Sequence, residues 1–298
     1  MQLNSEIVTT PPRASATVVL LRDDPQKGLE VFLLRRHTAS AVLGGAYVFP
    51  GGKLDAADCT PDLHAHLDAE PHALHRALGE PDLPVHTAAG LYVAAVREAL
   101  EECGVLFARA TDTADVHDAS LRQQWQHQLH TGVAFADILR AADLRVDTQH
   151  LAPWSRWITP IQPSVTNKRF DTRFFVAVLP PGQEPRHDDI EATDSFWLSP
   201  LEALTRYWAN QVTLAPPQIM SLYHLKQHTN AHSVLAEALQ RKPPVIQPEP
   251  FDDKGTRVIC YPGDARHPVP ERAFPGPSRL RFTDGRFEPE GGLARLLD

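Results

Sequence analysis

The sequence contains little cysteine, with three residues, Cys59, Cys103 and Cys260, among 298. Three scattered cysteines are too few for a disulfide framework or a cysteine-based zinc site, which favours a reducing compartment. The sequence also lacks any run of about 18 apolar residues, the length a membrane-spanning helix needs. Residues 1–12 lack the basic and apolar regions of a signal peptide. We therefore expect a cytoplasmic protein with no membrane partner.

Positive charge is scarce as well. Lys and Arg number 29 against 37 Asp and Glu, a net charge of -8, which argues against a broad nucleic-acid surface. A small phosphate-bearing molecule stays compatible with this charge, because a metal ion and a few arginines can offset it locally. At 298 residues and 42% hydrophobic content, the chain is long enough to bury a sizeable core.

Residues 90–105 predict one helix with an unusual concentration of acid. Apolar positions at helical spacing would bury one face, and Gly104 stands where a helix commonly ends in the left-handed conformation. Glu98, Glu101 and Glu102 fall at i, i+3 and i+4 and so share about one turn. Like charges at this spacing cost roughly 0.2–0.5 kcal/mol per pair on an isolated helix. The pattern favours a hard divalent cation, Mg²⁺ or Mn²⁺, which takes oxygen ligands.

The same segment carries a family resemblance. Residues 97–105, Arg-Glu-Ala-Leu-Glu-Glu-Cys-Gly-Val, resemble the second half of the Nudix box, Gly-x5-Glu-x7-Arg-Glu-U-x-Glu-Glu-x-Gly-U, in which U is a bulky aliphatic residue. Residues 49–53, Phe-Pro-Gly-Gly-Lys, resemble the turn that opens the box. Counting on from Gly52 places Asp58 where the pattern has Glu. The chain is thus similar to the Nudix hydrolases, with its box in two parts.

An insertion separates the two halves of the box. About 31 residues are added between Asp58 and Arg97, and a surface loop can absorb them because loop-closure cost grows slowly with length. The prolines and leucines of residues 59–90 predict a helical insertion made of two short helices broken near Pro71. A cap over the active site or an oligomer contact is favoured over a dedicated metal site at its five histidines, His64, His66, His72, His75 and His86.

The resemblance implies an α/β fold of the Nudix type, an α/β/α sandwich with a mixed sheet. Apolar runs predict strands at 14–21, 29–36, 46–49, 151–159 and 196–198, and residues 167–178 read as a basic loop that leads into a buried strand. Helical spacing predicts helices at 114–130, 133–142 and 200–207, and a C-terminal helical extension, one long helix or a pair, at 215–239.

We expect a Nudix domain at residues 1–245 and a C-terminal arm at 246–298. The arm is rich in Pro and Gly, and short strands are expected within it at 258–261 and 279–282. An extended arm lying on the body or on a second copy is favoured over an independent domain. A homodimer is left open.

The resemblance also assigns roles to the residues of the box. Glu98, Glu101 and Glu102 would hold one to three Mg²⁺ or Mn²⁺ ions, with the carbonyl of Gly52 as a further ligand. Arg97 would orient the glutamates, through Asp58. Glu101, Glu102 and Arg97 are thus the expected catalytic residues. The general base would come from the box or from the acidic loop 184–191, where no single residue stands out.

Four basic residues at strand ends could hold phosphates opposite the acidic helix: Arg36, Lys168, Arg169 and Arg173. The alternative is that they are solvated. Residues 33–36 with 45–52 are similar to the upstream signature of the coenzyme A diphosphatase branch. The patterns that mark ADP-ribose and NADH hydrolases are missing around residues 119–120 and 162–164.

The leading hypothesis is therefore a metal-dependent Nudix pyrophosphohydrolase. Its partner would be a small-molecule diphosphate substrate, a nucleoside diphosphate derivative, with coenzyme A or acyl-coenzyme A ahead of others. The alternative is a catalytically inactive Nudix-fold binding or regulatory protein. A purely structural helical protein is a third possibility, which Glu98, Glu101 and Glu102 argue against, because a module without catalysis has no need of three carboxylates on one turn.

Overall fold

The computed structural model describes residues 3–4, 6–110 and 116–297. Its first element is a hairpin of β1 (Arg13–Asp24) and β2 (Gly28–Arg36). The side chain of Asp24 accepts hydrogen bonds from the N–H groups of Gln26 and Lys27, which tightens the turn between the strands. Gly28 has φ of 72°, a conformation that favours glycine. Both strands begin within one residue of their predicted positions.

The central sheet has eight strands and mixed pairing. Six follow the order β10-β7-β8-β1-β2-β3, while β4 pairs with β1 and β9 with β2. β1 runs parallel to β8, and β10 parallel to β7, whereas the other pairs are antiparallel. The further strands are β3 (Tyr47–Val48), β4 (Gly51–Lys53), β7 (Ala152–Ile158), β8 (Phe170–Val178), β9 (Ala192–Leu198) and β10 (Val245–Ile246).

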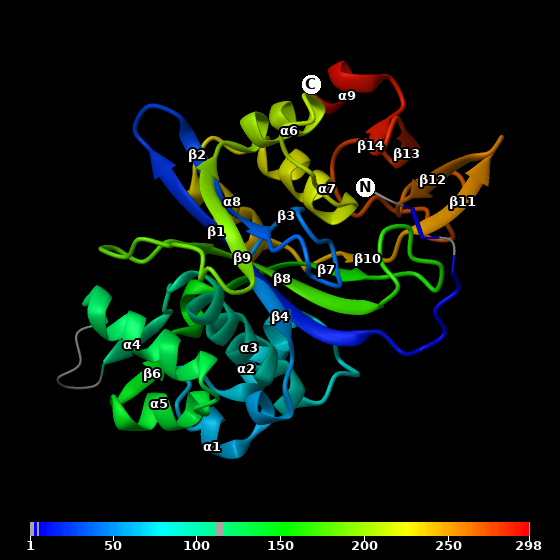
Figure 1. Ribbon diagram of the computed structural model, residues 1–298. Coiled ribbons are helices and arrows are strands. Elements are labelled where there is room, and N and C mark those ends of the chain that lie inside the picture. The colour runs from blue at the N-terminus through cyan, green and yellow to red at the C-terminus, as the bar shows by residue number, and fades with distance from the viewer. Residues whose placement is uncertain (1–2, 5, 111–115, 298) are drawn as a thin grey trace.

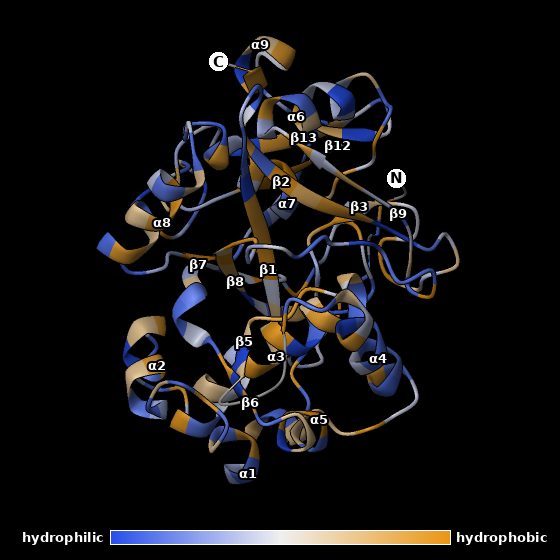
Figure 2. Cartoon of the chain, turned by 90° about the vertical axis from the view of Figure 1, so that its left-hand side faces the viewer, coloured by the Kyte–Doolittle hydropathy of each residue, from blue (hydrophilic) through white to orange (hydrophobic). Residues whose placement is uncertain are grey.

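Helices cover both faces of this sheet (Figure 1). Side chains alternate along a strand, so β1 sends Val18 and Leu20 into one core and Val19 and Leu21 into another. The first core lies under α2 (Pro71–Leu78), α3 (Val85–Cys103), α4 (Ala119–His130) and α5 (Phe135–Ala141). The second lies under α6 (Pro200–Trp208), α7 (Pro216–Leu225) and α8 (Ala231–Gln240). The expected α/β/α sandwich is confirmed, and apolar colour gathers on β1 and α3 between the layers (Figure 2).

The insertion folds against the first core. Its elements are the 3-10 turn η1 (Ala56–Cys59), the short α1 (Pro61–His64) and α2. The two expected helices are present, and the break between them falls before Pro71. α3 begins at Val85, five residues before the predicted start, so the end of the insertion is the first turn of the acidic helix. Four leucines anchor the insertion in the core: Leu63, Leu67, Leu74 and Leu78.

Two smaller pieces complete this half of the molecule. β5 (Ala108–Ala110) and β6 (Leu144–Val146) form a two-stranded ribbon, followed by the 3-10 turn η2 (Thr148–His150). The helix predicted to begin at residue 114 begins at Ala119, after the capping residue Asp118, while residues 111–115 lie outside the described residues. Trp125 is buried in the first core, as expected.

The C-terminal helical extension is a pair, not one helix. α7 ends at Leu225, and the side chain of Asn230 starts α8 by accepting the N–H of Ser233. No helix in the described part of the chain is long and apolar enough to cross a membrane.

Residues 249–297 form a small sheet with a short helix. β11 (Glu249–Asp253), β12 (Thr256–Cys260), β13 (Arg279–Thr283) and β14 (Arg286–Pro289) pair antiparallel in that order, and α9 (Gly292–Leu297) follows. The expectation of an extended arm included β12 and β13 but missed their partners. The hydroxyl of Tyr207 in α6 donates to the carbonyl of Phe287 over 2.9 Å and accepts its N–H over 2.8 Å, which joins this sheet to the body.

Candidate active site

The two halves of the interrupted motif meet at one place. β4 pairs with β1 and lies against the C-terminal part of α3, where it meets Glu98 and Glu102. A Cβ at Gly51 would stand 2.4 Å from the carbonyl oxygen of Ala16, and a Cβ at Gly52 would stand 2.4 Å from the carboxylate of Glu98. The turn therefore requires glycine at position 51, against the backbone of β1, whereas a larger residue at position 52 would displace the carboxylate of Glu98. The N–H of Gly51 also donates to Glu102 Oε2 over 2.8 Å.

Arg97 links the remaining parts of the motif. Its Nε and Nη2 donate to the two oxygens of Asp58, both over 2.9 Å. Its Nη1 donates to Glu98 over 2.8 Å and to Glu101 over 3.3 Å, and its Nη2 also donates to the carbonyl of Lys53 over 3.0 Å. The structure thus brings Asp58 to Arg97 across the insertion. One buried guanidinium fixes an acid from η1 and two from α3.

The acids of α3 carry more negative charge than their surroundings balance. Burial raises the pKa of Glu98 to about 7; the nearby Arg97 acts against this, while Glu101 adds to it. Burial likewise raises the pKa of Glu102 well above its ordinary value, and the charge of Glu98 adds to the effect. A site where desolvation and like charge act together favours a bound cation. The donors are all oxygen, so they fit a hard divalent ion.

These residues line a large cavity of about 900 Å³. One wall is charged and carries Glu98, Glu101 and Glu102 together with Lys53. Another wall is largely apolar and comes from the 41–43 loop and from the stretch between the end of α4 and the start of α5: Val42, Leu43, Leu129, Val133 and Phe135. Thr60, Asp62 and Leu63 from the start of the insertion also line it, so the insertion borders the cavity.

Two of the four predicted phosphate-binding residues reach this cavity. Arg36 lies with its Nη1 3.8 Å from Glu102 Oε1 and its Nη2 3.5 Å from Glu191 Oε2. Lys168 also lines the cavity. Arg169 does not line it, since its guanidinium donates to the carbonyls of Thr159 and Thr10. The expected placement of Arg169 opposite the acidic helix is corrected.

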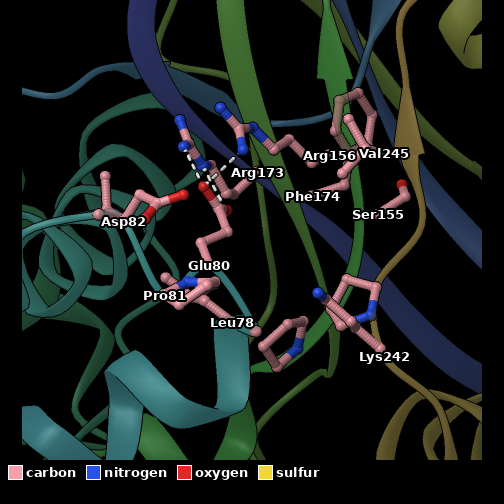
Figure 3. Close-up of a pocket in the computed structure, with 14 residues that line it drawn as sticks. Leu78, Glu80, Pro81, Asp82, Ser155, Arg156, Arg173, Phe174, Lys242 and Val245 are labelled. Carbon is pink, nitrogen blue, oxygen red and sulfur yellow. Dashed lines mark hydrogen bonds and ion pairs between the residues drawn. The ribbon is translucent and has the colours of Figure 1, made fainter.

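The expected placement of Arg173 is corrected too. It lines a second cavity of about 400 Å³, beside the loop that joins α2 to α3 (Figure 3). There its Nε donates to Glu80 Oε1 over 2.9 Å, and Arg156 Nη1 lies 2.8 Å from Glu80 Oε2. Arg156 also forms two hydrogen bonds with Asp171, of 2.8 and 2.7 Å. Arg173 therefore ties the insertion to β8.

The structure singles out one residue of the predicted acidic loop, Glu191, and adds one residue that was not predicted, Gln218. Glu191 lines the cavity, whereas Asp188 of the same loop turns its carboxylate back to accept the N–H groups of Ile190, Glu191 and Ala192. Gln218 in α7 lines the cavity with a side chain that is 7% exposed, and its Oε1 has no hydrogen-bond partner among the described residues. The only signal for Gln218 in the sequence is a polar residue within an otherwise apolar helical turn.

Comparison with known proteins agrees with this geometry. The family model described as NUDT19 Nudix domain matches residues 12–225. The chain is 26% identical over 227 residues to a Xenopus laevis protein named acyl-coenzyme A diphosphatase NUDT19, covering 66% of this chain and 59% of that protein. The human protein of the same name is 29% identical over 265 residues, covering 76% and 70%. The match thus spans less than two thirds of the Xenopus relative.

A solved structure shows the same fold. The crystal structure of a NUDIX hydrolase from Alicyclobacillus acidocaldarius superimposes with a TM-score of 0.61 at 29% identity, covering 77% of this chain and 97% of that one. The family match extends over more than half of the chain and includes both halves of the motif. The resemblance found in residues 49–53 and 97–105 is confirmed, and the protein belongs to the Nudix hydrolases, in the family of the NUDT19 Nudix domain.

Proposed function

We propose that the protein is a divalent-metal-dependent diphosphatase that cleaves the phosphoric anhydride of a nucleoside diphosphate derivative, with coenzyme A or acyl-coenzyme A as substrate. The observation that carries the proposal is the reassembled motif, in which Arg97 joins Asp58 to the glutamates of α3 at the wall of one cavity. The names of the Xenopus and human relatives support the choice of substrate.

Oxygen ligands for the metal would come from α3 and β4. Glu98, Glu101, Glu102 and the carbonyl of Gly52 would hold one or more Mg²⁺ or Mn²⁺ ions. When bound, such an ion supplies positive charge at the phosphoryl oxygens and lowers the pKa of a water. The raised pKa values of Glu98 and Glu102 support this assignment, because a cation would relieve the repulsion that raises them.

The chain's own residues would do the positioning and move the proton. Arg97 holds Glu98 and Glu101 in place from one side, while the N–H of Gly51 holds Glu102 from the other. Arg36 and Lys168 line the cavity and would neutralise the diphosphate. Glu191 would accept the proton of the attacking water, since it lines the same cavity and its side chain is half exposed.

The apolar wall of the cavity suits the rest of the substrate. Its volume of about 900 Å³ lies near the upper end of the roughly 300–1,000 Å³ that ligand sites of drug-sized molecules cover. Leu43, Val133 and Phe135 would contact an uncharged arm such as pantetheine and its acyl chain. This division into a charged wall and an apolar wall supports a diphosphate that carries a long apolar group.

We also propose the division of the chain into a Nudix domain at 1–245 and a C-terminal unit at 246–298. The family match within 12–225 supports it. We move the boundary by one residue, to after Ile246, because β10 (Val245–Ile246) pairs with β7 of the main sheet.

A substrate screen tests the proposed function. Coenzyme A, acyl-coenzyme A, NADH, ADP-ribose and nucleotide sugars are offered with Mg²⁺ or Mn²⁺ to the wild type, to Glu102→Gln and to the control Glu202→Gln on α6. We expect turnover of coenzyme A esters by the wild type and the control, and a loss of about 100-fold or more in Glu102→Gln. Absence of turnover of every compound would favour a binding or regulatory protein instead, and equal rates in Glu102→Gln would remove that residue from the reaction.

A further inference from the structure

Two histidines and a glutamate meet where α7 gives way to α8. His224 is in the last turn of α7, His228 follows in the connection, and Glu237 lies on α8. α7 and α8 contribute to the second core, on the face of the sheet opposite α3, and none of the three residues lines the cavity of the glutamates. The cluster is therefore separate from the proposed active site.

The three side chains point their ligand atoms at one another. His224 Nε2 lies 3.0 Å from Glu237 Oε1, and His228 Nε2 lies 3.0 Å from Glu237 Oε2. Three ligand atoms, one from each residue, all lie within 4.8 Å of one another. Ligand atoms about 2.0–2.2 Å from a tetrahedral metal ion stand a little over 3 Å apart, so this spacing suits a common centre.

Ser233 orients the ring of His228. The Nδ1 atom of His228 lies 3.0 Å from the hydroxyl oxygen of Ser233, and that hydroxyl donates to the carbonyl of Asn230 over 2.8 Å. A hydroxyl has one proton, so Ser233 accepts from His228 Nδ1 when it donates to Asn230. This leaves Nε2 as the ring nitrogen that faces Glu237.

His224 is also suited to bind a metal. Its ring is 7% exposed and stacks against Trp154 with 4.5 Å between ring centroids. The stacking fixes the direction in which Nε2 points.

Outer contacts orient the other two ligands. Arg241 Nε donates to Glu237 Oε1 over 2.7 Å while its Nη1 donates to the carbonyl of Trp154, which holds the carboxylate in place. Ser233 does the same for His228. Metal-binding histidines commonly donate their second ring N–H to such an outer partner. Arg241 leaves Oε2 as the oxygen facing His228.

We propose that His224, His228 and Glu237 form a binding site for a divalent transition-metal ion of the zinc type, with water in the fourth position. Two imidazole nitrogens and one carboxylate oxygen suit Zn²⁺ rather than Mg²⁺, which prefers oxygen alone. The ion would fasten α8 to the end of α7. Gln218, six residues earlier on α7, lines the active-site cavity about 9 Å along the helix, so the site would also steady one wall of that cavity.

Metal binding to the full chain tests this proposal. Protein freed of metal by chelation is titrated with Co²⁺ in excess Mg²⁺, which would fill the oxygen site, and the visible band of four-coordinate cobalt is followed. Zn²⁺ content after dialysis is measured by elemental analysis. The variants are His228→Ala, Glu237→Gln, Ser233→Ala and Glu102→Gln, and the matched control is His232→Ala, an exposed histidine on the same helix as Glu237.

We expect one equivalent of four-coordinate Co²⁺ or Zn²⁺ in the wild type, in His232→Ala and in Glu102→Gln. His228→Ala and Glu237→Gln should lose it, and Ser233→Ala should bind about 10- to 100-fold more weakly. Zn²⁺ should raise the melting temperature of the wild type and the control but not of His228→Ala, a readout that a hydrogen-bond role would not move. A wild type without the cobalt band, or a band lost in Glu102→Gln and kept in His228→Ala, overturns the proposal.

Discussion

Glu80 and Glu102 are both largely shielded from water, but nearby arginines neutralise the charge of Glu80 much more fully than that of Glu102. Glu80 accepts a hydrogen bond from Arg173 and forms an ion pair with Arg156, which also donates to the neighbouring Asp171. Two carboxylates are thus paired with two guanidinium groups. Glu102 has one N–H bond from Gly51 and a distant Arg36 at 3.8 Å, and it faces Glu98. A balanced cluster holds the structure together. The unbalanced cluster is where the proposed metal ion would bind.

Among the variants that test this comparison, Arg97→Ala should have the largest effect on stability and turnover. This change leaves Asp58 buried without its partner and releases Glu98 and Glu101, and truncating one side of a buried ion pair costs about 3–5 kcal/mol. We expect a loss of that order in the free energy of urea unfolding, together with loss of turnover. The exposed Arg76→Ala serves as control. Unchanged stability in Arg97→Ala would show that Asp58 does not depend on the guanidinium.

Glu102→Gln changes only the cluster in which negative charge is not balanced, the acids of α3. We expect turnover to fall by about 10²- to 10³-fold, which corresponds to roughly 2.7–4 kcal/mol of transition-state stabilisation. In metal-free buffer the same variant should melt at a higher temperature than the wild type, because burial and Glu98 penalise the charge of Glu102. Scanning calorimetry with and without Mg²⁺ checks the second effect. A lower melting temperature without metal would contradict the imbalance.

Glu80→Gln changes the cluster in which the charges are balanced. It leaves Arg173 and Arg156 short of one carboxylate, and we expect a loss of about 1–3 kcal/mol in the free energy of unfolding. Turnover per folded molecule should change little, since Glu80 does not line the cavity of Glu98. Asp82→Asn, from the lining of the same small cavity, is the matched control. A rate loss as large as that of Glu102→Gln would place Glu80 in the catalytic machinery.

The smallest effect concerns a balanced acid in the C-terminal sheet, Asp264. Burial would raise its pKa, but hydrogen bonds from Arg279, the N–H of Arg266 and Ser278 outweigh this and lower it below 3.8. The stability it adds is therefore complete above the unfolded pKa and is lost as the pH falls through the folded one. Asp264→Asn should unfold with less dependence on pH below about 4. Acid titration followed by circular dichroism checks this, and identical curves for both proteins would contradict it.

The part of the site that follows local spacing could be predicted from the sequence. Glu98, Glu101 and Glu102 share a helical turn, and the resemblance then located Gly52 and Asp58. The prediction for Arg173 was wrong because it rested on a basic residue near a strand end and not on strand alternation. Thr172 lines the active-site cavity, and the next side chain on β8 points to the other face. Gln218 could not be located, because only the tertiary fold brings α7 to a motif more than a hundred residues away.

For the fold, too, local patterns in the sequence predicted part of the structure. The main strands and helices were predicted from their hydrophobic period, with ends shifted by a few residues. The C-terminal sheet was underestimated because its hairpin turns were overlooked. Lys254-Gly255 and Asp284-Gly285 each have two positive φ angles, of 50° and 81° and of 50° and 82°, the conformation of tight two-residue hairpins. Asp284-Gly285 at such a position predicts a hairpin, and this signal identifies β14 as the partner of β13.

The pair of hydrogen bonds between Tyr207 and Phe287 governs how the chain can be shortened in the laboratory. An expression version that stops after α8 would strip a buried phenol of both partners, at about 1–3 kcal/mol, and would uncover the apolar side chains of α6 that the small sheet shields. Such a fragment would tend to precipitate. Protein intended for crystals or fusions should therefore run at least through Pro289.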